Sequence, residues 1–246
     1  MAKKSKKKVR RLASDIILVC LVAIFLVSGY NIYKIVKDYQ KDQSAYSDVT
    51  RAAKAEEWTG DVDFDALKKI NSEVIAWVYL KDSKINYPIV QTDNNEEYLH
   101  ILFDGTYGGA GTLFADCMTE DAFSQFNTIV YGHHMRDGSM FNNLKKFKDS
   151  SYVDDHPQFE IILPDGKYHM LVWAFLNQPA DSDLYTNNVD ADEADKYLDW
   201  IEKHAEYVTD VKVDADDRIV ALSTCAYEYD DARYVVVGKL VPWEDK

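Results

Sequence analysis

The chain has 246 residues, of which 42 are acidic and 28 are basic, and its formal net charge is −14. An acidic balance of this size argues against nucleic acid as a partner, because phosphate contacts need clusters of lysine and arginine. Aromatic residues make up 13% of the chain, which is typical of a folded globular protein and not of a disordered one.

The N-terminus combines a basic tail with an apolar run. Residues 1–11 hold seven of the basic side chains and no acidic one, and between residues 16 and 33 only Ser28 and Asn31 are clearly polar. Eighteen helical residues span roughly 27 Å, close to the thickness of a bilayer core. We expect a cytoplasmic tail over 1–11, one transmembrane anchor over 12–35 and an extracellular remainder, by the positive-inside rule. A cleaved signal peptide is the alternative.

A helical linker is predicted over 36–62, because residues 36–58 are polar with scattered apolar positions and contain neither proline nor glycine. The globular domain is predicted over 63–246. Asp63 is placed to cap a first short helix that uses Phe64, Leu67 and Ile70.

The remainder of the chain has a β pattern. Two helices are also expected, a short one over 139–147 and a longer one over 190–208, where apolar residues recur at steps of three and four. Many short strands with few helices predict a closed or nearly closed barrel. The eight candidate strands are 74–80, 85–90, 112–115, 127–131, 158–163, 168–176, 218–224 and 234–241.

The chain has three cysteines, and Cys20 lies inside the apolar run. Cys117 and Cys225 could form a disulfide in an oxidising compartment. Cysteine and histidine do not occur at zinc-binding spacing. The acidic residues around Cys117 do not have EF-hand spacing. We therefore expect no metal and no cofactor.

Chemically active side chains of three kinds lie at the ends of predicted strands. Cys225 ends an apolar strand, Arg233 begins the next strand, and His133 and His134 follow the strand at 127–131. A thiol, an imidazole and a guanidinium can serve as nucleophile, proton carrier and oxyanion partner in acyl transfer. Neighbouring residues on a strand point to opposite faces, so one of the two histidines can reach Cys225, but spacing does not say which.

These segments resemble the sortase family, and class B sortases in particular. The stretch NTIVYGHHM at 127–135 is similar to the segment that carries the sortase histidine. LSTC at 222–225 with Arg233 is similar to the TLxTC…R signature, with Ala221 where threonine is common. NSEVIAW and INYPIVQ, at 71–77 and 85–91, match the first two barrel strands. The resemblance covers roughly residues 64–243, and the helix over 190–208 is its class B feature.

The resemblance implies a mostly β fold, an eight-stranded sortase-type barrel with N-terminal helices and a long helix between strands 6 and 7. It implies a peptidase-like cysteine transpeptidase on the outer face of a Gram-positive cell membrane. The implied substrate is a secreted protein with a C-terminal NPxTN-like sorting signal. Its threonine carbonyl would be joined through a thioester to an amine of the peptidoglycan cross-bridge, in lipid II or in the wall.

The resemblance also implies residue roles. Cys225 is the nucleophile, and His133, which follows Tyr-Gly directly, is the acid and base. Arg233 is the oxyanion and substrate-binding residue. Further substrate contacts are implied for Asn95, Leu99, Tyr131, Ser223, Tyr185 and Thr186. Ala226 stands where some class B members carry glutamate, so a role for that carboxylate does not transfer.

Two other functions fit the same residues. A pilin-polymerising sortase would use a lysine of a second subunit as the acceptor. A non-enzymatic, membrane-tethered binding module would give Cys225 no special reactivity.

Overall fold

The computed structural model describes residues 2–226 and 231–243, with side chains from residue 15 onward. Its contacts divide the chain into two units, Met1–Lys41 and Asp42–Lys246. The described residues of the first unit all belong to helix α1, Ala2–Ala52, which continues into the second unit.

Helix α1 joins the predicted tail, anchor and most of the predicted linker in one element. Its described part, Asp15–Ala52, contains an 18-residue window with a mean hydropathy of 2.3 and none of it buried, so the helix is long and apolar enough to cross a membrane. The helix ends at Ala52, earlier than the predicted 58. The backbone of Lys54 is left-handed, with φ of +58°, which stops the helix. The Lys54 ammonium then pairs with Asp63 at 2.8 Å.

Asp63 caps helix α2, Phe64–Ile70, by accepting a hydrogen bond from the Ala66 backbone N–H at 3.0 Å. The predicted cap is therefore confirmed. Phe64 and Leu67 are the buried residues of this helix.

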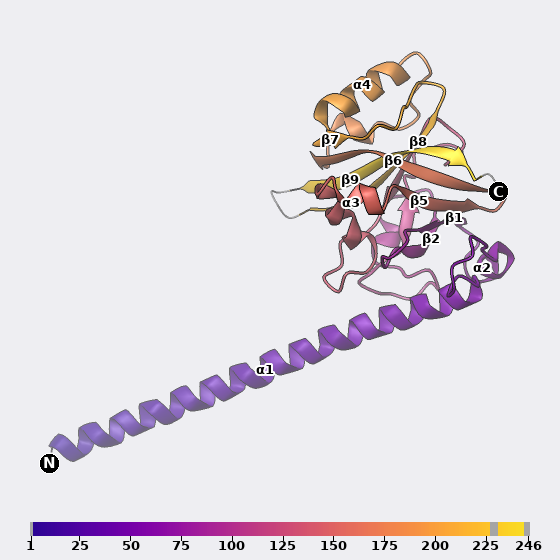
Figure 1. The fold of residues 1–246 in the computed structure, drawn as a ribbon. Coiled ribbons are helices and arrows are strands. Elements are labelled where there is room, and N and C mark those ends of the chain that lie inside the picture. The colour runs from indigo at the N-terminus through magenta and orange to yellow at the C-terminus, as the bar shows by residue number, and fades with distance from the viewer. Residues whose placement is uncertain (1, 227–230, 244–246) are drawn as a thin grey trace. The chain divides into compact units, whose positions relative to one another are not determined.

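All eight predicted strands are present, and they close a barrel in the order β5, β1, β2, β3, β4, β8, β9, β6, with β6 paired again to β5 (Figure 1). Pairs β2–β3 and β4–β8 are parallel, and the other pairs are antiparallel. The bounds are β1 Val74–Tyr79, β2 Asn86–Val90, β3 Leu113–Ala115, β4 Asn127–Tyr131, β5 Gln158–Leu163, β6 Gly166–Pro179, β8 Arg218–Cys225 and β9 Ala232–Pro242.

Residues 219–222 of strand β8 form an unbroken apolar run because they are buried on both faces. Val220 and Leu222 belong to the barrel core, whereas Ile219 and Ala221 belong to a second core that includes Leu198 of helix α4, Ala194–His204. Figure 1 shows α4 over the sheet face formed by β6, β8 and β9. A strand covered on both sides loses the alternation of a half-exposed strand, and β8 is thereby held rigidly along its length.

Two predicted helices are present with different bounds. Helix α4 is shorter than the predicted 190–208, because the chain leaves it at Ala205 and Tyr207–Val208 pairs with β6 as the short strand β7. The helix expected over 139–147 is a 3₁₀ helix, η2, Phe141–Lys148. Three further short helices lie in segments where no helix was predicted. They are η1 Glu97–Leu99, α3 Tyr152–Asp155 and η3 Asp183–Tyr185.

Candidate active site

The sheet order brings the three predicted catalytic residues together. Strand β8 lies between β4 and β9, and Tyr131 at the end of β4 is in register with Ser223. Cys225 at the end of β8 is in register with Arg233 on β9. The chain that leaves β4 therefore passes beside Cys225, and His133 is two residues beyond the end of β4.

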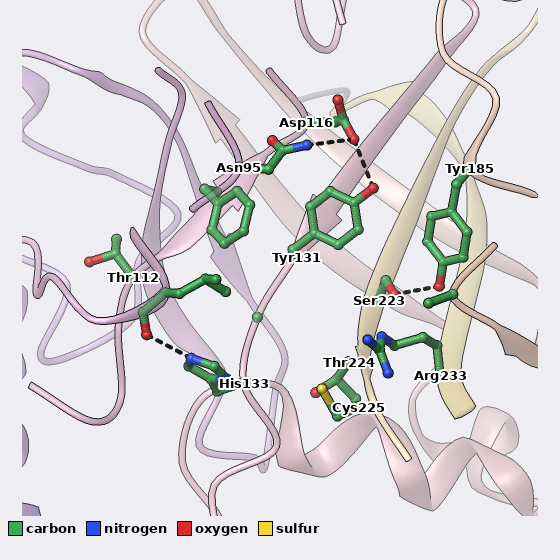
Figure 2. A pocket seen from close by; sticks show the side chains of 14 residues that line it. Asn95, Thr112, Asp116, Tyr131, His133, Tyr185, Ser223, Thr224, Cys225 and Arg233 are labelled. Carbon is green, nitrogen blue, oxygen red and sulfur yellow. Dashed lines mark hydrogen bonds between the residues drawn. The ribbon is translucent and has the colours of Figure 1, made fainter. Parts of the chain in front are cut away.

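A cavity of about 300 Å³ lies at these strand ends. Figure 2 shows the imidazole of His133 and the sulfur of Cys225 at the same end of the cavity, with the Arg233 guanidinium beside the cysteine. The lining residues are Asn95, Leu99, Thr112, Phe114, Asp116, Tyr131, Gly132, His133, Ala180, Tyr185, Ser223, Thr224, Cys225 and Arg233.

Cys225 is a partly exposed free thiol. Cys117 is also unpaired, so the structure does not contain the disulfide that the sequence allowed between the two. The thiol of Cys225 opens on the cavity, while its carbonyl accepts a hydrogen bond from His134 Nδ1 at 2.8 Å. The carbonyl of the last β8 residue is thus held by a neighbour while its thiol faces the cavity.

The two adjacent histidines face different surroundings. His133 lines the cavity with Cys225, whereas His134 lines a separate cavity with Arg136, Asn142 and Lys145. The tertiary structure therefore places His133, and not His134, among the residues that line the cavity with Cys225.

The tautomer of His133 follows from its hydrogen bond. Its Nε2 lies 2.7 Å from the Leu99 carbonyl oxygen, and a carbonyl can only accept, so Nε2 carries the proton. Burial lowers the pKa of His133 below its ordinary value of 6.5; the Leu99 carbonyl partly opposes this effect and nearby His100 adds to it. The side chain is then neutral near pH 7, with the lone pair on Nδ1 available to take a proton.

Gly132 is required where the chain turns from β4 to His133. A Cβ at this position would lie 2.3 Å from a Leu113 methyl carbon and 2.6 Å from the Phe141 ring. Any other residue would therefore force Leu113, Phe141 or the end of β4 itself to shift, directly before His133.

Arg233 holds a positive charge at the cavity without an acidic partner in the described part of the chain. Its Nη1 donates to the Ala232 carbonyl at 3.1 Å, and it forms no ion pair with Asp231. Asp230, the other acid that the sequence placed near it, lies outside the described residues. The guanidinium is therefore able to donate to a carbonyl or oxyanion in the cavity.

Most of the predicted substrate contacts line the same cavity. They are Asn95, Leu99, Tyr131, Tyr185 and Ser223, and the hydroxyls of Tyr185 and Ser223 are 2.9 Å apart. Thr186 is not among the lining residues; its carbonyl accepts a hydrogen bond from Asn127 at 2.7 Å.

Sequence reasoning did not assign a site role to Asp116. This carboxylate is buried, lines the cavity and accepts a hydrogen bond from the Tyr131 hydroxyl at 2.8 Å (Figure 2). A usable signal was its position directly after the predicted strand 112–115, since strand ends are where this chain places its functional side chains. Within the described residues, Asp116 does not belong to a cluster of metal-ligating groups.

Comparison with known proteins identifies the family. A family model, the sortase domain, matches residues 78–241. The chain therefore belongs to the sortase family of cysteine transpeptidases, and the resemblance read from its motifs is confirmed.

Curated relatives of similar length are class B sortases. Sortase B of Listeria monocytogenes is 30% identical over 243 residues, which are 95% of this chain and 99% of the relative. Sortase B of Staphylococcus aureus is 30% identical over 234 residues, which are 92% of this chain and 96% of the relative.

Solved structures agree with this assignment. Sortase B from Bacillus anthracis in complex with AAEK2 has a TM-score of 0.75 and 31% identity, covering 84% of this chain and 98% of that one. A Staphylococcus aureus sortase B–substrate complex has a TM-score of 0.68 and 25% identity, covering 87% of this chain and 99% of that one.

Proposed function

We propose that this protein is a membrane-anchored class B sortase that cleaves an NPxTN-like C-terminal sorting signal at the threonine carbonyl. The part of the substrate that ends in this threonine is then transferred to an amine of the peptidoglycan cross-bridge. The observation that carries the proposal is the presence of Cys225, His133 and Arg233 in one cavity. Secreted proteins with the signal are the donor substrates.

In the acylation half, His133 Nδ1 takes the proton of the Cys225 thiol, and the sulfur attacks the threonine carbonyl carbon. The carbon–sulfur bond forms, and the negative charge that develops on the carbonyl oxygen is stabilised by the Arg233 guanidinium. The peptide carbon–nitrogen bond then breaks, and the leaving amine receives the proton from His133. A thioester remains on Cys225.

In the transfer half, the acceptor amine attacks the thioester carbonyl and gives up a proton to His133. The new carbon–nitrogen bond forms as the carbon–sulfur bond breaks, and the departing sulfur takes back a proton. The hydrogen bond from His133 Nε2 to the Leu99 carbonyl supports this role, because it keeps the imidazole oriented while Nδ1 gives and receives protons.

The anchor and topology belong to the same proposal. The seven basic side chains of residues 1–11 precede the apolar helix, and the rest of the chain is strongly acidic. By the positive-inside rule this arrangement supports a cytoplasmic N-terminus and a catalytic domain outside the membrane.

The test is cleavage of a fluorogenic NPxTN peptide by the full-length protein in detergent micelles. Cys225→Ala should lower kcat/KM by at least about a thousandfold, because no nucleophile remains. Cys117→Ala is the matched control: it removes the other extramembrane thiol, which does not line the cavity, and should retain activity within about threefold. Cleavage by Cys225→Ala at the wild-type rate would refute the proposal.

The acceptor is identified by mass spectrometry of a digest of the cell wall. A cross-bridge amine on the threonine supports the proposed transfer, whereas a lysine of a second protein subunit indicates a pilin polymerase. Labelling of Cys225 by a thiol reagent across pH separates both from a binding module, in which the thiol would react like an ordinary free cysteine.

A further inference from the structure

Residues 184–188, which we call the strap, begin within helix η3, continue toward α4 and contribute to the wall of the catalytic cavity. Tyr185 is the strap residue that lines the cavity. Its ring stacks with that of Tyr131 at a centroid distance of 6.0 Å, and its hydroxyl lies 2.9 Å from that of Ser223 (Figure 2). No residue of the strap belongs to a strand, so its backbone polar groups need partners from other parts of the chain.

The beginning of the strap is held by two buried side chains. The hydroxyl of Tyr197, on α4, donates to the Leu184 carbonyl at 2.5 Å. Asn127 Nδ2, at the start of β4, donates to the Thr186 carbonyl at 2.7 Å. Tyr197 is 8% exposed and Asn127 is 3% exposed, so this part of the strap is tied to the interior of the protein.

Asn188, at the end of the strap, bonds to the loop at 116–121 that follows β3. Its Nδ2 donates to the Met118 carbonyl at 2.7 Å, and its Oδ1 accepts the Glu120 backbone N–H at 3.2 Å. One partner is an acceptor and the other is a donor, so together they fix the orientation of the amide.

Asn187 adds a third hydrogen bond between the same two segments. Its Oδ1 accepts the hydroxyl proton of Thr119 at 2.8 Å, and Thr119 is 4% exposed. We call these three hydrogen bonds the latch. They join residues that are 68 to 70 positions apart in the chain, so the latch is a tertiary contact and not part of a local turn.

The backbone of Asn188 has the left-handed conformation, with φ of +52°. Few residues other than glycine adopt it readily, and asparagine is one of them. The residue at this position has to tolerate the left-handed backbone and also supply a donor and an acceptor. Asparagine meets both requirements.

The latch joins two parts of the cavity wall. The loop after β3 is fixed independently by Gln91, whose Nε2 donates to the carbonyls of Asp116 and Thr119 at 2.9 and 2.8 Å. Asp116 lines the cavity from this loop, and Tyr185 lines it from the strap. Asn188 does not line the cavity, so it acts on the wall through the strap and does not touch the reacting atoms.

We propose that Asn188 is a positioning residue that latches the strap to the loop after β3 and thereby holds Tyr185 in place before the sorting peptide binds. The inference rests on the proposed function, because the wall in question belongs to the cavity that cleaves this peptide. Without the latch, the peptide has to order the strap as it binds, which lowers its affinity. The loss is the same for bound substrate and for the transition state, so KM should rise while kcat stays unchanged.

Two substitutions of Asn188 break the latch in different ways. Asn188→Gly removes both hydrogen bonds of the side chain and still fits the left-handed backbone. Asn188→Asp keeps the shape and the acceptor for Glu120, but it places an oxygen opposite the Met118 carbonyl, where two acceptors repel each other. In full-length protein in detergent micelles, each change should raise KM for the NPxTN peptide about fivefold, the effect of one net hydrogen bond. The value of kcat and the rate of Cys225 alkylation should stay within about twofold of wild type.

Hydrogen exchange measured by mass spectrometry reports on the latch itself. In both variants residues 184–188 and 116–121 should exchange faster than in wild type, because each segment loses a partner. Exchange in β8 should not change. If both segments exchange faster while KM keeps its wild-type value, the latch has a structural role alone and the inference is wrong.

Asp82→Gly is the matched control. Asp82 is an exposed residue in the turn between β1 and β2, its backbone is also left-handed, with φ of +55°, and it does not line the cavity. The control therefore introduces a glycine of the same kind away from the latch, and its KM should equal that of wild type. If KM in Asn188→Gly and Asn188→Asp is no higher than in Asp82→Gly, the inference is overturned.

Thr119→Val covers the case in which the Asn188 variants do not fold. It keeps the shape of the side chain and removes the hydroxyl that donates to Asn187, so it should raise KM twofold to fivefold, by about one hydrogen bond or less, and speed exchange of the strap. In that case a wild-type KM in Thr119→Val overturns the inference. Failure of wild type to cleave the peptide would instead refute the proposed function.

Discussion

The turn after β4 places two identical side chains in different surroundings. His133 and His134 have the same side chain and adjacent positions, yet one opens on the cavity with Cys225 and the other binds the Cys225 carbonyl from another cavity. Gly132 makes this possible, since it has no Cβ to meet Leu113 and Phe141. The surroundings of each histidine therefore depend on the direction in which its side chain points, and not on residue type alone.

Alanine substitution of each histidine tests this difference. His133→Ala should lower kcat/KM on the NPxTN peptide by about a hundredfold to ten-thousandfold, the usual contribution of a general acid and base. His134→Ala removes a hydrogen bond to the Cys225 carbonyl and should cost about tenfold or less. Circular dichroism of both variants confirms folding, and equal losses in the two would contradict the assignment.

Among the elements, the C-terminal part of α1 supports one side of the cavity through residues 110–112. Tyr46 is buried, and its hydroxyl donates to the Gly111 carbonyl and lies 3.1 Å from the Thr112 hydroxyl. The carboxylate of Asp42 accepts the Ala110 N–H at 3.0 Å. Thr112 lines the catalytic cavity, so residues that the sequence assigns to a linker hold one side of the site.

Tyr46→Phe should therefore reduce stability. The change removes the hydroxyl and leaves the buried Gly111 carbonyl without this donor, which should cost about 1 to 2 kcal/mol in the free energy of unfolding. Urea denaturation of the full-length protein in micelles measures the loss. Tyr33→Phe, at a tyrosine that is 63% exposed, is the matched control and should leave stability unchanged.

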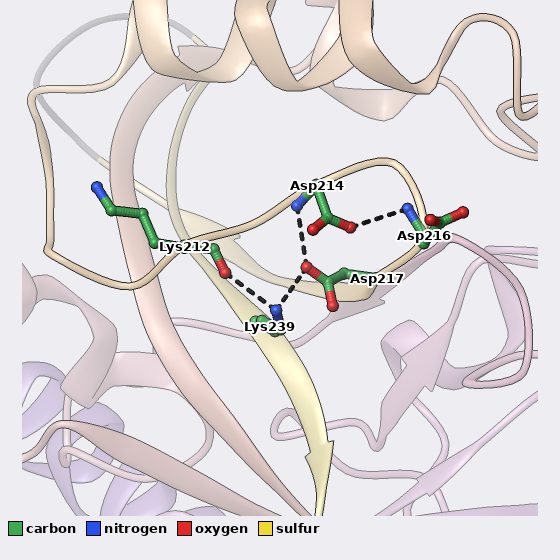
Figure 3. A network of polar contacts seen from close by, with 5 residues as sticks. All are labelled: Lys212, Asp214, Asp216, Asp217 and Lys239. Carbon is green, nitrogen blue, oxygen red and sulfur yellow. Dashed lines mark hydrogen bonds and ion pairs between the residues drawn. The ribbon is translucent and has the colours of Figure 1, made fainter.

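The beginning of β8 is held by another set of polar contacts, shown in Figure 3. Lys239 of β9 donates to Asp217 at 2.6 Å and to the Lys212 carbonyl at 3.0 Å. Asp217 in turn accepts the Asp214 N–H at 2.9 Å. These contacts fix the turn before β8, and so both ends of the strand that carries Cys225 are tied to β9.

At the scale of the whole molecule, two partly buried histidines, His133 and His134, make the stability of the folded protein depend on pH. Burial is the main cause that lowers the pKa of both His133 and His134. Below the unfolded value of about 6.5, the unfolded chain binds more protons at these positions than the folded chain does. Folding is therefore disfavoured as pH falls through this range and is not affected by these groups above it.

We expect Tm to fall when the pH is lowered from 7.5 to 5.5. Carboxylates begin to titrate at the lower end, so wild type is compared with His133→Gln, which removes one partly buried histidine. Differential scanning calorimetry should show a smaller fall for His133→Gln than for wild type. An equal or larger fall would show that His133 does not have the lowered pKa.

The sequence by itself determined the eight barrel strands, the cap at Asp63 and the family, because strand periodicity, turn residues and the motifs around His133 and Cys225 are local. It misjudged the end of the helix at 190–208, where pairing of Tyr207 with Phe175 draws the chain into β7. The family motif singled out His133, but only the tertiary structure put His133 and His134 in different cavities and brought Asp116 to Tyr131 and Asn95. Those relations join residues far apart in the chain, and they depend on sheet order, on close packing at Gly132 and on where a buried carboxylate finds its donors.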